Sequence, residues 1–265
     1  MRRILHKWIR FAVFVYFSLH VGAGAFAQSP ITIEQLLAKP ATWQLSSSLD
    51  YRSVMSAAGM FERQSNVSTG VRYGVSSRLE LNAQLQMQQF TLAGAVPKVR
   101  EQNQAISVGA NWLAMPESNR PALLLEARAM LASSGAARRQ YLSGGQFAVT
   151  TYKSIDPLVL SLSTSINLQR GYRLDSVTVS PGSSWRIAPG VNFAANSSVT
   201  LFGGAAFERR NATGLGSGRV LGPTERLGIH AGVALSVARA HSLFVTADLA
   251  TDRSGGMRVQ WFYEF

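Results

Sequence analysis

The sequence predicts an all-β fold: a transmembrane antiparallel up-and-down β-barrel of about 12 strands, with a short N-terminal helix ahead of it. Apolar and polar residues alternate from residue 42 almost to the C-terminus, which is typical of strands with one apolar and one polar face. The segments between these strands alternate between short and long. No run reaches the ~18 apolar residues that a transmembrane helix needs, so the pattern favours strands.

The first 27 residues have the organisation of a secretory signal peptide. A basic stretch (Arg2, Arg3, Lys7 and Arg10) precedes the apolar run 11–19, and Ala25–Ala27 forms an A-x-A cleavage site. We therefore expect export, with cleavage near Ala27. The predicted units are the signal peptide 1–27, a periplasmic N-terminal segment 28–41 and the transmembrane barrel 42–265.

A short helix is expected within the segment 28–41. Thr32–Gln35 resembles a capping box, and the helix would end before Pro40, with Ile33, Leu36 and Leu37 on one face. The segment is either a plug in the barrel mouth or an ordered lead-in to the first strand.

The first six expected strands each place apolar residues on one face and polar residues on the other. The sixth, around Gln146–Lys153, has the weakest alternation. The apolar faces carry Trp43, Leu45, Leu49 and Tyr51; Val67, Val71, Tyr73 and Val75; Leu79, Leu81, Leu85 and Met87; Ile106, Val108 and Trp112; Leu123, Leu125, Ala127 and Leu131; Phe147 and Val149.

The last six expected strands continue this pattern. Their apolar faces carry Leu158, Leu160, Leu162, Ile166 and Leu168; Trp185, Ile187, Val191 and Phe193; Val199, Leu201 and Phe207; Leu227, Ile229, Val233 and Leu235; Leu243, Val245 and Leu249; Met257, Val259, Trp261, Tyr263 and Phe265. Trp261, Tyr263 and Phe265 end the chain and are the expected assembly signal and interfacial aromatic residues, with Phe262 the one apolar residue on the polar face.

The expected connections fall into two classes. Short ones join strands two–three, four–five, six–seven, eight–nine and ten–eleven, whereas longer ones lie near 55–64, 92–101, 133–142, 170–182 and 210–223. Short periplasmic turns, long outer loops and an even strand number are typical of bacterial outer-membrane barrels. The chain has no cysteine, which excludes disulfides and thiolate metal sites.

The polar faces would line the lumen. Their ionisable candidates are Asp50, Arg52, Arg72, Arg78, Glu80, Glu126, Arg128, Arg186, Arg226, His230, Asp248, Arg258 and Glu264, with Glu208 on the same face. Because the two signs nearly balance, these residues form either an ion-paired network that narrows the pore or an arginine track for anionic solutes.

The expected outer loops are basic. The formal net charge is +12, and removal of the four basic signal residues leaves +8. The basic loop residues are Arg63, Lys98, Arg100, Arg138, Arg139, Arg170, Arg173, Arg209, Arg210, Arg219 and Arg253. Such a rim suits lipopolysaccharide phosphates or an anionic solute. The expected partners are outer-membrane lipids, lipopolysaccharide, the outer-membrane assembly machinery and an unidentified small solute, with no nucleic acid; an oligomer is compatible with the sequence.

Catalysis and metal binding find little support in the sequence. Only His230 and His241 follow the signal peptide, and no acidic residue lies close to either in the sequence. We expect no enzyme activity, no metal site and no cofactor.

One hairpin resembles a known family. Tyr73–Leu81 (YGVSSRLEL) resembles a hairpin of outer-membrane transporters labelled meta-pathway of phenol degradation, and weaker similarities lie at Pro181–Trp185, Asn196–Leu201 and from Thr224 to Phe265. A related twelve-stranded barrel exports functional-amyloid subunits, but no long coiled coil precedes the barrel here. The resemblance implies no catalytic or binding residues.

The sequence therefore predicts an outer-membrane channel for small solutes, hydrophobic or aromatic compounds among them. The alternatives are an export pore for a secreted amyloid-like polypeptide and a structural barrel without transport.

Overall fold

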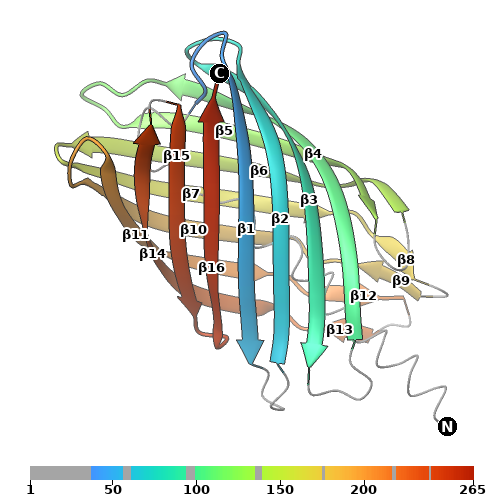
Figure 1. Cartoon of the computed structure of the whole chain (residues 1–265). Coiled ribbons are helices and arrows are strands. Elements are labelled where there is room, and N and C mark those ends of the chain that lie inside the picture. The colour runs from blue at the N-terminus through green and yellow to red at the C-terminus, as the bar shows by residue number, and fades with distance from the viewer. Residues whose placement is uncertain are drawn as a thin grey trace.

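The chain folds into a closed antiparallel barrel of twelve strands (Figure 1). The computed structural model describes residues 37–55, 61–93, 99–134, 139–174, 177–216, 219–238 and 240–265. The predicted barrel is thus confirmed, whereas the predicted signal peptide and the start of the predicted helix lie outside the described residues. Within the described residues, no helix is long and apolar enough to cross a membrane.

The barrel strands follow the chain almost in order around the wall. They are β1 (Trp43–Met55), β2 (Phe61–Gly74), β3 (Leu79–Ala93), β4 (Val99–Met115), β5 (Ala122–Ser134), β6 (Arg139–Ile155), β7 (Leu158–Gln169), β10 (Ser184–Ala194), β11 (Val199–Arg210), β14 (Thr224–Ala238), β15 (His241–Ala250) and β16 (Ser254–Glu264). Each pairs with its chain neighbours, and β16 pairs with β1 to close the barrel.

The closing ladder joins the two ends of the chain. β1 and β16 pair from Gln44↔Glu264 to Val54↔Ser254. Beyond the ladder, the Trp43 and Phe265 backbones exchange two hydrogen bonds of 3.1 and 3.0 Å. Since a closed barrel has no free edge, each of its twelve strands pairs with a neighbour on both sides.

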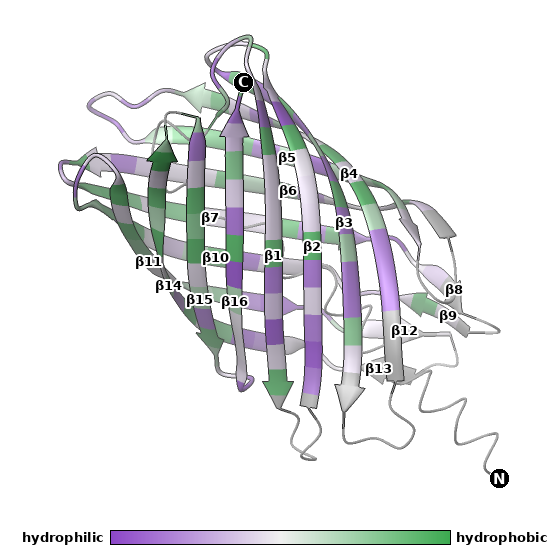
Figure 2. Cartoon of the chain, in the orientation of Figure 1, coloured by the Kyte–Doolittle hydropathy of each residue, from purple (hydrophilic) through white to green (hydrophobic). Residues whose placement is uncertain are grey.

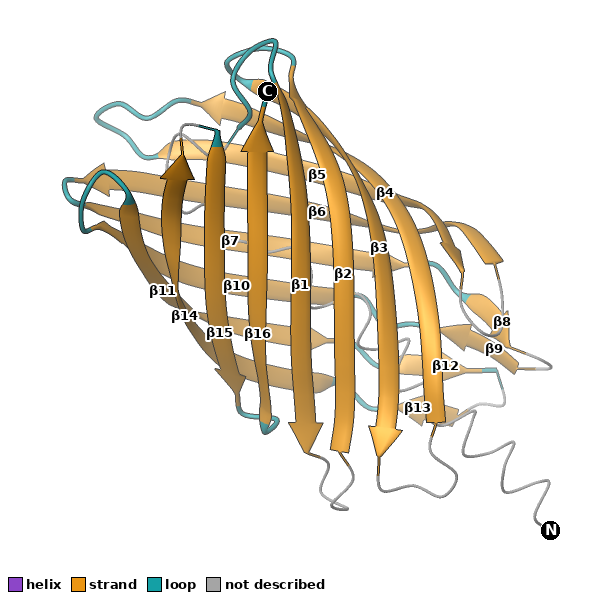
Figure 3. Ribbon diagram, viewed as in Figure 1, coloured by secondary structure: helices purple, strands orange, loops and turns teal. Residues whose placement is uncertain are grey.

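The two ends of the barrel differ in part as the sequence predicted. The turn end carries the C-terminus and the short connections 75–78, 116–121, 156–157 and 195–198 (Figure 3). The opposite end, here the loop end, carries the two long connections 170–183 and 211–223, but its other connections are no longer than 116–121. Several strands extend further toward the loop end than predicted: β2 begins at Phe61, β4 at Val99 and β6 at Arg139. β11 likewise ends only at Arg210, so five arginines that were expected in loops lie in barrel strands: Arg63, Arg100, Arg139, Arg209 and Arg210.

Two of the loops contain strands that the sequence did not indicate. β8 (Tyr172–Leu174), β9 (Val177–Ser180), β12 (Thr213–Leu215) and β13 (Arg219–Leu221) form a separate four-stranded sheet at the loop end. The β9–β12 pairing joins the two loops. Strands of three or four residues are too short for alternation to be recognisable, which explains why they were missed.

Hydrophobic and hydrophilic residues alternate along many of the strands (Figure 2), and large apolar side chains of every barrel strand are exposed on the outer surface. Neighbouring residues differ sharply in exposure: Leu162 is 47 % exposed, whereas the next residue, Ser163, is 6 % exposed. On β3 the outward apolar residues run from Leu79 to Met87, which spans about 27 Å along the strand, or about 21 Å along the axis at a ~40° tilt. That height suits the hydrocarbon layer of a membrane.

Aromatic side chains gather on the outer surface at the turn end. Trp261 stacks on Tyr263 with ring centres 6.0 Å apart, and Tyr263 stacks on Phe265 at 5.6 Å. Trp43 and Tyr73 meet on the neighbouring strands at 4.6 Å. Amphipathic rings of this kind stabilise a barrel at the membrane interface.

The first prediction tests the assignment of the two wall faces. Leu162→Arg places a charge on the lipid side, which costs about 2–4 kcal/mol near the bilayer centre, whereas Ser163→Arg places it inside. We expect Leu162→Arg to block folding into lipid vesicles and Ser163→Arg to fold, as measured by heat-modifiable mobility on gels. Equal folding yields would contradict the assignment.

Candidate functional site in the barrel interior

The inward face of the wall carries polar and charged side chains at several heights. Those with low exposure include Gln44, Asn66, Glu80, Gln86, Gln146, Ser161, Ser165, Asn192, Glu208 and Arg210. Charged groups cluster near the turn end, at mid-height and near the loop end. Each cluster has its own pattern of contacts.

The cluster near the turn end centres on a fully buried carboxylate, Glu80, which is 0 % exposed. Arg72 donates from Nε to Glu80 Oε1 at 2.9 Å, and its Nη2 lies 2.6 Å from Oε2. Asn111 also donates to Oε1 at 2.8 Å, and Gln44 accepts from Arg72 at 2.6 Å. A two-point arginine–carboxylate pair with further hydrogen bonds is the arrangement that makes a buried charge tolerable.

Residues 37–41, here the N-terminal strap, bind to this cluster. The Ala38 backbone N–H donates to Glu80 Oε2 at 2.6 Å. Pro40 forms a parallel bridge with Gly74, and the Ala41 N–H donates to the Gly74 carbonyl at 2.7 Å. A Cβ on Gly74 would lie only 2.1 Å from the Lys39 carbonyl oxygen. Glycine at this position therefore lets the strap lie against the wall.

The strap also contacts the wall at β5 and β6 through Leu37. Leu37 packs against a buried apolar cluster of Ala122, Leu124 and Tyr152 on the inner faces of β5 and β6. The described strap thus lies inside the mouth at the turn end. The sequence left two alternatives for this segment, a plug in the barrel mouth and an ordered lead-in to the first strand. The position of the strap favours the plug.

The mid-height cluster is also closely bonded. Asp50 on β1 forms an ion pair with Arg258 on β16 and accepts hydrogen bonds from Asn66 at 3.1 Å and Ser48 at 3.2 Å. On the neighbouring part of the wall, Arg128 donates to Gln84 at 2.7 Å. The Asp50 contacts link adjacent strands, whereas the Arg128–Gln84 hydrogen bond spans β4 and joins β5 to β3.

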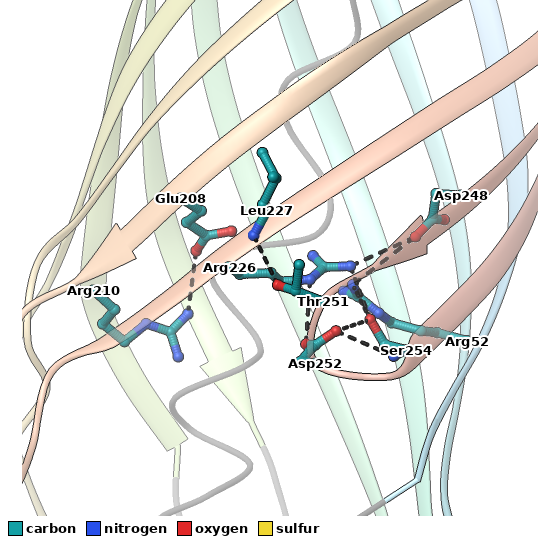
Figure 4. Close-up of polar contacts among 9 residues, drawn as sticks. All are labelled: Arg52, Glu208, Arg210, Arg226, Leu227, Asp248, Thr251, Asp252 and Ser254. Atoms are coloured by element: carbon teal, nitrogen blue, oxygen red, sulfur yellow. Dashed lines mark hydrogen bonds and ion pairs between the residues drawn. The ribbon is translucent and has the colours of Figure 1, made fainter.

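The cluster near the loop end is drawn in Figure 4. Arg52 and Arg226 each donate to the Ser254 hydroxyl, at 3.1 and 3.0 Å. The same guanidinium groups lie 3.9 and 3.6 Å from Asp248, and Arg226 lies 3.2 Å from Asp252. Nearby, Glu208 and Arg210 pair at 3.7 Å. These separations are longer than those around Glu80.

Three predicted residues need separate comment. Arg78 was a lumen candidate, and it lies in the exposed turn 75–78, because β3 begins only at Leu79. Glu264 lies at the turn end and pairs with Lys39 at 2.6 Å. His241 is the first residue of β15 rather than a turn residue, and its Nδ1 accepts from Trp261 Nε1 at 3.3 Å.

His230 gains a neighbour that the linear sequence could not show. Asp248 lies directly across the β14–β15 pair from His230. On the other side its cross-strand partner is Gly204, where a Cβ would meet His230 Cε1 at 2.8 Å. The imidazole therefore occupies space that only glycine leaves free.

The inner face also carries apolar patches that were not predicted from the sequence. Besides Leu124 and Tyr152, a second patch joins Phe202, Ala234 and Phe244, with Phe262 packed against it. Phe244 and Phe262 meet edge to face with ring centres 5.1 Å apart. The sequence carries a signal for both patches, since Leu124, Phe202, Phe244 and Phe262 each break the alternation of their strands.

One carboxylate lies in a connection at the turn end. Glu117, in the loop 116–121, accepts hydrogen bonds from the Ser154 N–H and hydroxyl, both at 2.8 Å, and pairs with Lys153 at 3.4 Å. Burial raises the pKa of Glu117, but these hydrogen bonds and the Lys153 charge outweigh it, so the pKa lies below its ordinary value. The contacts connect the loop to the β6–β7 turn.

The fold was compared with known proteins. The sequence matches no family model and no curated protein. Among solved structures, the chain is similar to an outer membrane channel from Pseudomonas putida F1, with a TM-score of 0.71 and 8 % identity over 91 % of this chain and 100 % of the other.

Two autotransporter barrels are also similar. The transport unit of AIDA-I from Escherichia coli gives a TM-score of 0.59 at 10 % identity, covering 96 % of this chain and 97 % of that one. The translocator domain of NalP from Neisseria meningitidis gives 0.54 at 14 % identity, covering 98 % and 96 %. What these proteins share with the chain is the barrel fold.

The second prediction concerns the strap. Gly74→Ala should displace it, because the new methyl group would overlap the Lys39 and Ala38 carbonyls. In a Leu37→Cys background, which supplies a single thiol because the chain has none, we expect Gly74→Ala to speed labelling by a water-soluble thiol reagent about tenfold or more. Labelling is measured by mass shift.

A matched control is Gly214→Ala, since a Cβ there meets only the Ser180 side chain at an ordinary 3.7 Å. It should leave the labelling rate unchanged. If Gly74→Ala also leaves the rate unchanged, the strap is not held by its contact with the wall.

Proposed function

We propose that the chain is a channel of the bacterial outer membrane that passes small solutes, hydrophobic or aromatic compounds among them. The observation that carries the proposal is the inner face of the closed barrel, where charged, amide and hydroxyl side chains alternate with the apolar outer residues. A soluble protein would bury its apolar face instead. An inner face of this kind suits an aqueous path through a membrane.

The expected passage is narrow. Twelve strands lie between the eight of barrels filled by side chains and the sixteen or more of open porins. Inward arginine side chains and the N-terminal strap, with Leu37 on the Leu124–Tyr152 patch, take up part of this space. The passage therefore suits solutes smaller than those that open porins admit.

The two apolar patches support solutes with an apolar part. Both the Leu124–Tyr152 patch and the Phe202–Phe244–Phe262 patch face inward, in the half of the barrel nearer the turn end. Aromatic side chains in a wall offer stacking and edge contacts to a planar ring. A pore that passes only hydrophilic solutes would not need two apolar patches on its inner face.

Location and partners follow from the same proposal. The outward aromatic residues would lie at the membrane interface, the turn end would face the periplasm, and the loop end would meet lipopolysaccharide through exposed residues such as Arg63 and Arg170. The resemblance of Tyr73–Leu81 to transporters labelled meta-pathway of phenol degradation agrees with aromatic solutes. The similar Pseudomonas putida channel agrees with a channel on the same fold.

The third prediction tests conduction. The purified barrel in a planar bilayer should give discrete conductance steps that are small compared with those of open porins. Thr246→Trp adds a large ring inside the barrel, whereas Val245→Trp adds it on the lipid side. We expect the first variant to lower the conductance at least about twofold and the second to leave it unchanged.

An absence of steps in correctly folded wild-type protein would overturn the channel proposal and favour a structural barrel. Equal effects of the two tryptophans would show that the current does not pass through the interior.

A further inference from the structure

The outer face of the wall becomes polar near the loop ends of β2, β3 and β4. On β3, for example, Met87 is the last outward apolar residue of the continuous series that begins at Leu79, and Gln89 follows it. The loop-end half of β2 is mostly hydrophilic in Figure 2, because both of its faces are polar there. The polar residues at these outward positions, here the outer polar patch, are Arg63, Ser65, Gln89, Thr91, Gln102 and Gln104. Each of them is exposed or partly exposed.

The strand register places these residues side by side. One row across β2, β3 and β4 consists of Ser65, Gln89 and Gln102. In the next row toward the loop end, Arg63 lies across from Thr91, and Thr91 lies across from Arg100. Adjacent strands are about 4.8 Å apart, so the backbone positions of Arg63 and Arg100 are about 10 Å apart. The patch therefore combines amide, hydroxyl and guanidinium groups over three neighbouring strands.

The basic charge of the patch is not offset on the outer face of these strands. The acidic residues of β1–β4 are Asp50, Glu62, Glu80 and Glu101. All of them occupy inward positions within these described strands: Glu62 and Glu80 are buried, Asp50 pairs with Arg258, and Glu101 lies across from the buried Phe90. By contrast, Arg63 is exposed, and its cross-strand neighbours are Ser53 and Thr91. The outward positions here thus favour an anionic partner.

Another outward arginine near the loop end has a different environment. Arg209 on β11 lies across from Glu225 on β14, and the two side chains form an ion pair at 3.4 Å. The charge of Arg209 is therefore offset by a carboxylate of the wall itself. This pair provides a matched comparison for Arg63, since both arginines are exposed on the outer face of a barrel strand.

The outer polar patch adjoins the apolar surface of the barrel. Val67 and Met87, which are 49 % and 40 % exposed, precede it on β2 and β3. Amide groups that faced hydrocarbon would lose their hydrogen bonds to water at a cost of several kcal/mol, so the patch belongs at the level of the lipid headgroups. With the turn end in the periplasm, as proposed above, these are the headgroups of the outer leaflet.

We propose that the outer polar patch binds the phosphorylated sugar headgroup of lipopolysaccharide. The Arg63 guanidinium group donates two N–H bonds to a phosphate, which is the geometry that arginine favours. The glutamine amides and the Thr91 hydroxyl group bond the hydroxyl and amide groups of the sugars, while the acyl chains lie against Val67 and Met87. The proposal rests on the outer-membrane location proposed above and adds a defined lipid site to it.

The test measures lipid binding to the full-length barrel folded in detergent micelles. Diphosphorylated lipid A is titrated at about 0.15 M salt, which screens general attraction between charges, and bound lipid is counted by native mass spectrometry. We expect Arg63→Gln to weaken binding about tenfold, because charge-assisted hydrogen bonds to a phosphate are lost. Arg209→Gln removes the same charge from a site already paired with Glu225, so it should leave lipid A binding unchanged.

A neutral variant and two further lipids test the chemistry of the site. Gln102→Ala leaves the charge unchanged, removes an exposed amide and should weaken lipid A binding several-fold. Dephosphorylated lipid A and phosphatidylglycerol should each bind at least about tenfold more weakly than diphosphorylated lipid A, since the first lacks the phosphates and the second lacks the sugars. Heat-modifiable mobility on gels shows that each variant is folded.

The outcomes separate this inference from the channel proposal. Equal effects of Arg63→Gln and Arg209→Gln, or equal binding of phosphatidylglycerol and lipid A, overturn the inference, because either result indicates general attraction to anionic lipid. Weaker binding by Arg63→Gln and Gln102→Ala, with Arg209→Gln unaffected, supports the site. The same preparation is assayed for conductance: conductance without preferential lipid A binding overturns the lipid site alone, whereas lipid A binding without conductance overturns the channel alone.

Discussion

The structure depends on the backbone ladder between its first and last strands. β1 and β16 pair along nearly their whole length, and the Trp43–Phe265 hydrogen bonds complete the ladder at the turn end. In a bilayer an unpaired strand edge costs several kcal/mol for each polar group, so only the closed arrangement is stable. Closure also fixes which alternate residues face inward. The interior chemistry follows from that constraint.

The charged side chains inside the barrel are paired in two ways, closely near the turn end and loosely near the loop end. Where Glu80 is fully buried, it is held by Arg72, Asn111 and the strap, so the site is structural and rigid. Near the loop end the contacts among Arg52, Arg226 and Asp248 are longer, and donors remain unfilled. Tight pairing near the turn end fixes the wall there, whereas the looser contacts near the loop end leave the Arg52, Arg226 and Asp248 side chains partly exposed.

The barrel was predictable from the sequence because alternate residues of a barrel strand face outward and inward. The sequence predicts that Leu162 faces outward and Ser163 inward, and their exposed fractions in the structure agree. Strand ends were less predictable, since polar hairpins beyond the membrane have no apolar outer face. Arg210 was thus expected in a loop, yet it lies in β11. The alternation also continued past a strand end, since Arg78 was expected in the third strand and lies in the turn 75–78.

The sequence allowed us to predict which residues of the candidate site face inward. It did not allow us to predict which of their side chains contact one another. Asp248 lies opposite His230, and Arg52 reaches Asp248 from a strand remote in the chain. Both facts depend on register and closure, which no local pattern encodes. The strap contact between Ala38 and Glu80 is likewise a long-range consequence of the closed mouth.

The most direct test of this account is water access to the two wall faces, using single cysteines in a chain that has none. Gln260→Cys on the inner face of β16 and Val259→Cys on its lipid face are compared in reconstituted vesicles with a membrane-impermeant thiol reagent. The account predicts that the thiol at position 260 reacts and that its modification lowers conductance, while the thiol at 259 stays unreactive. Reaction at 259 with protection at 260 would contradict it.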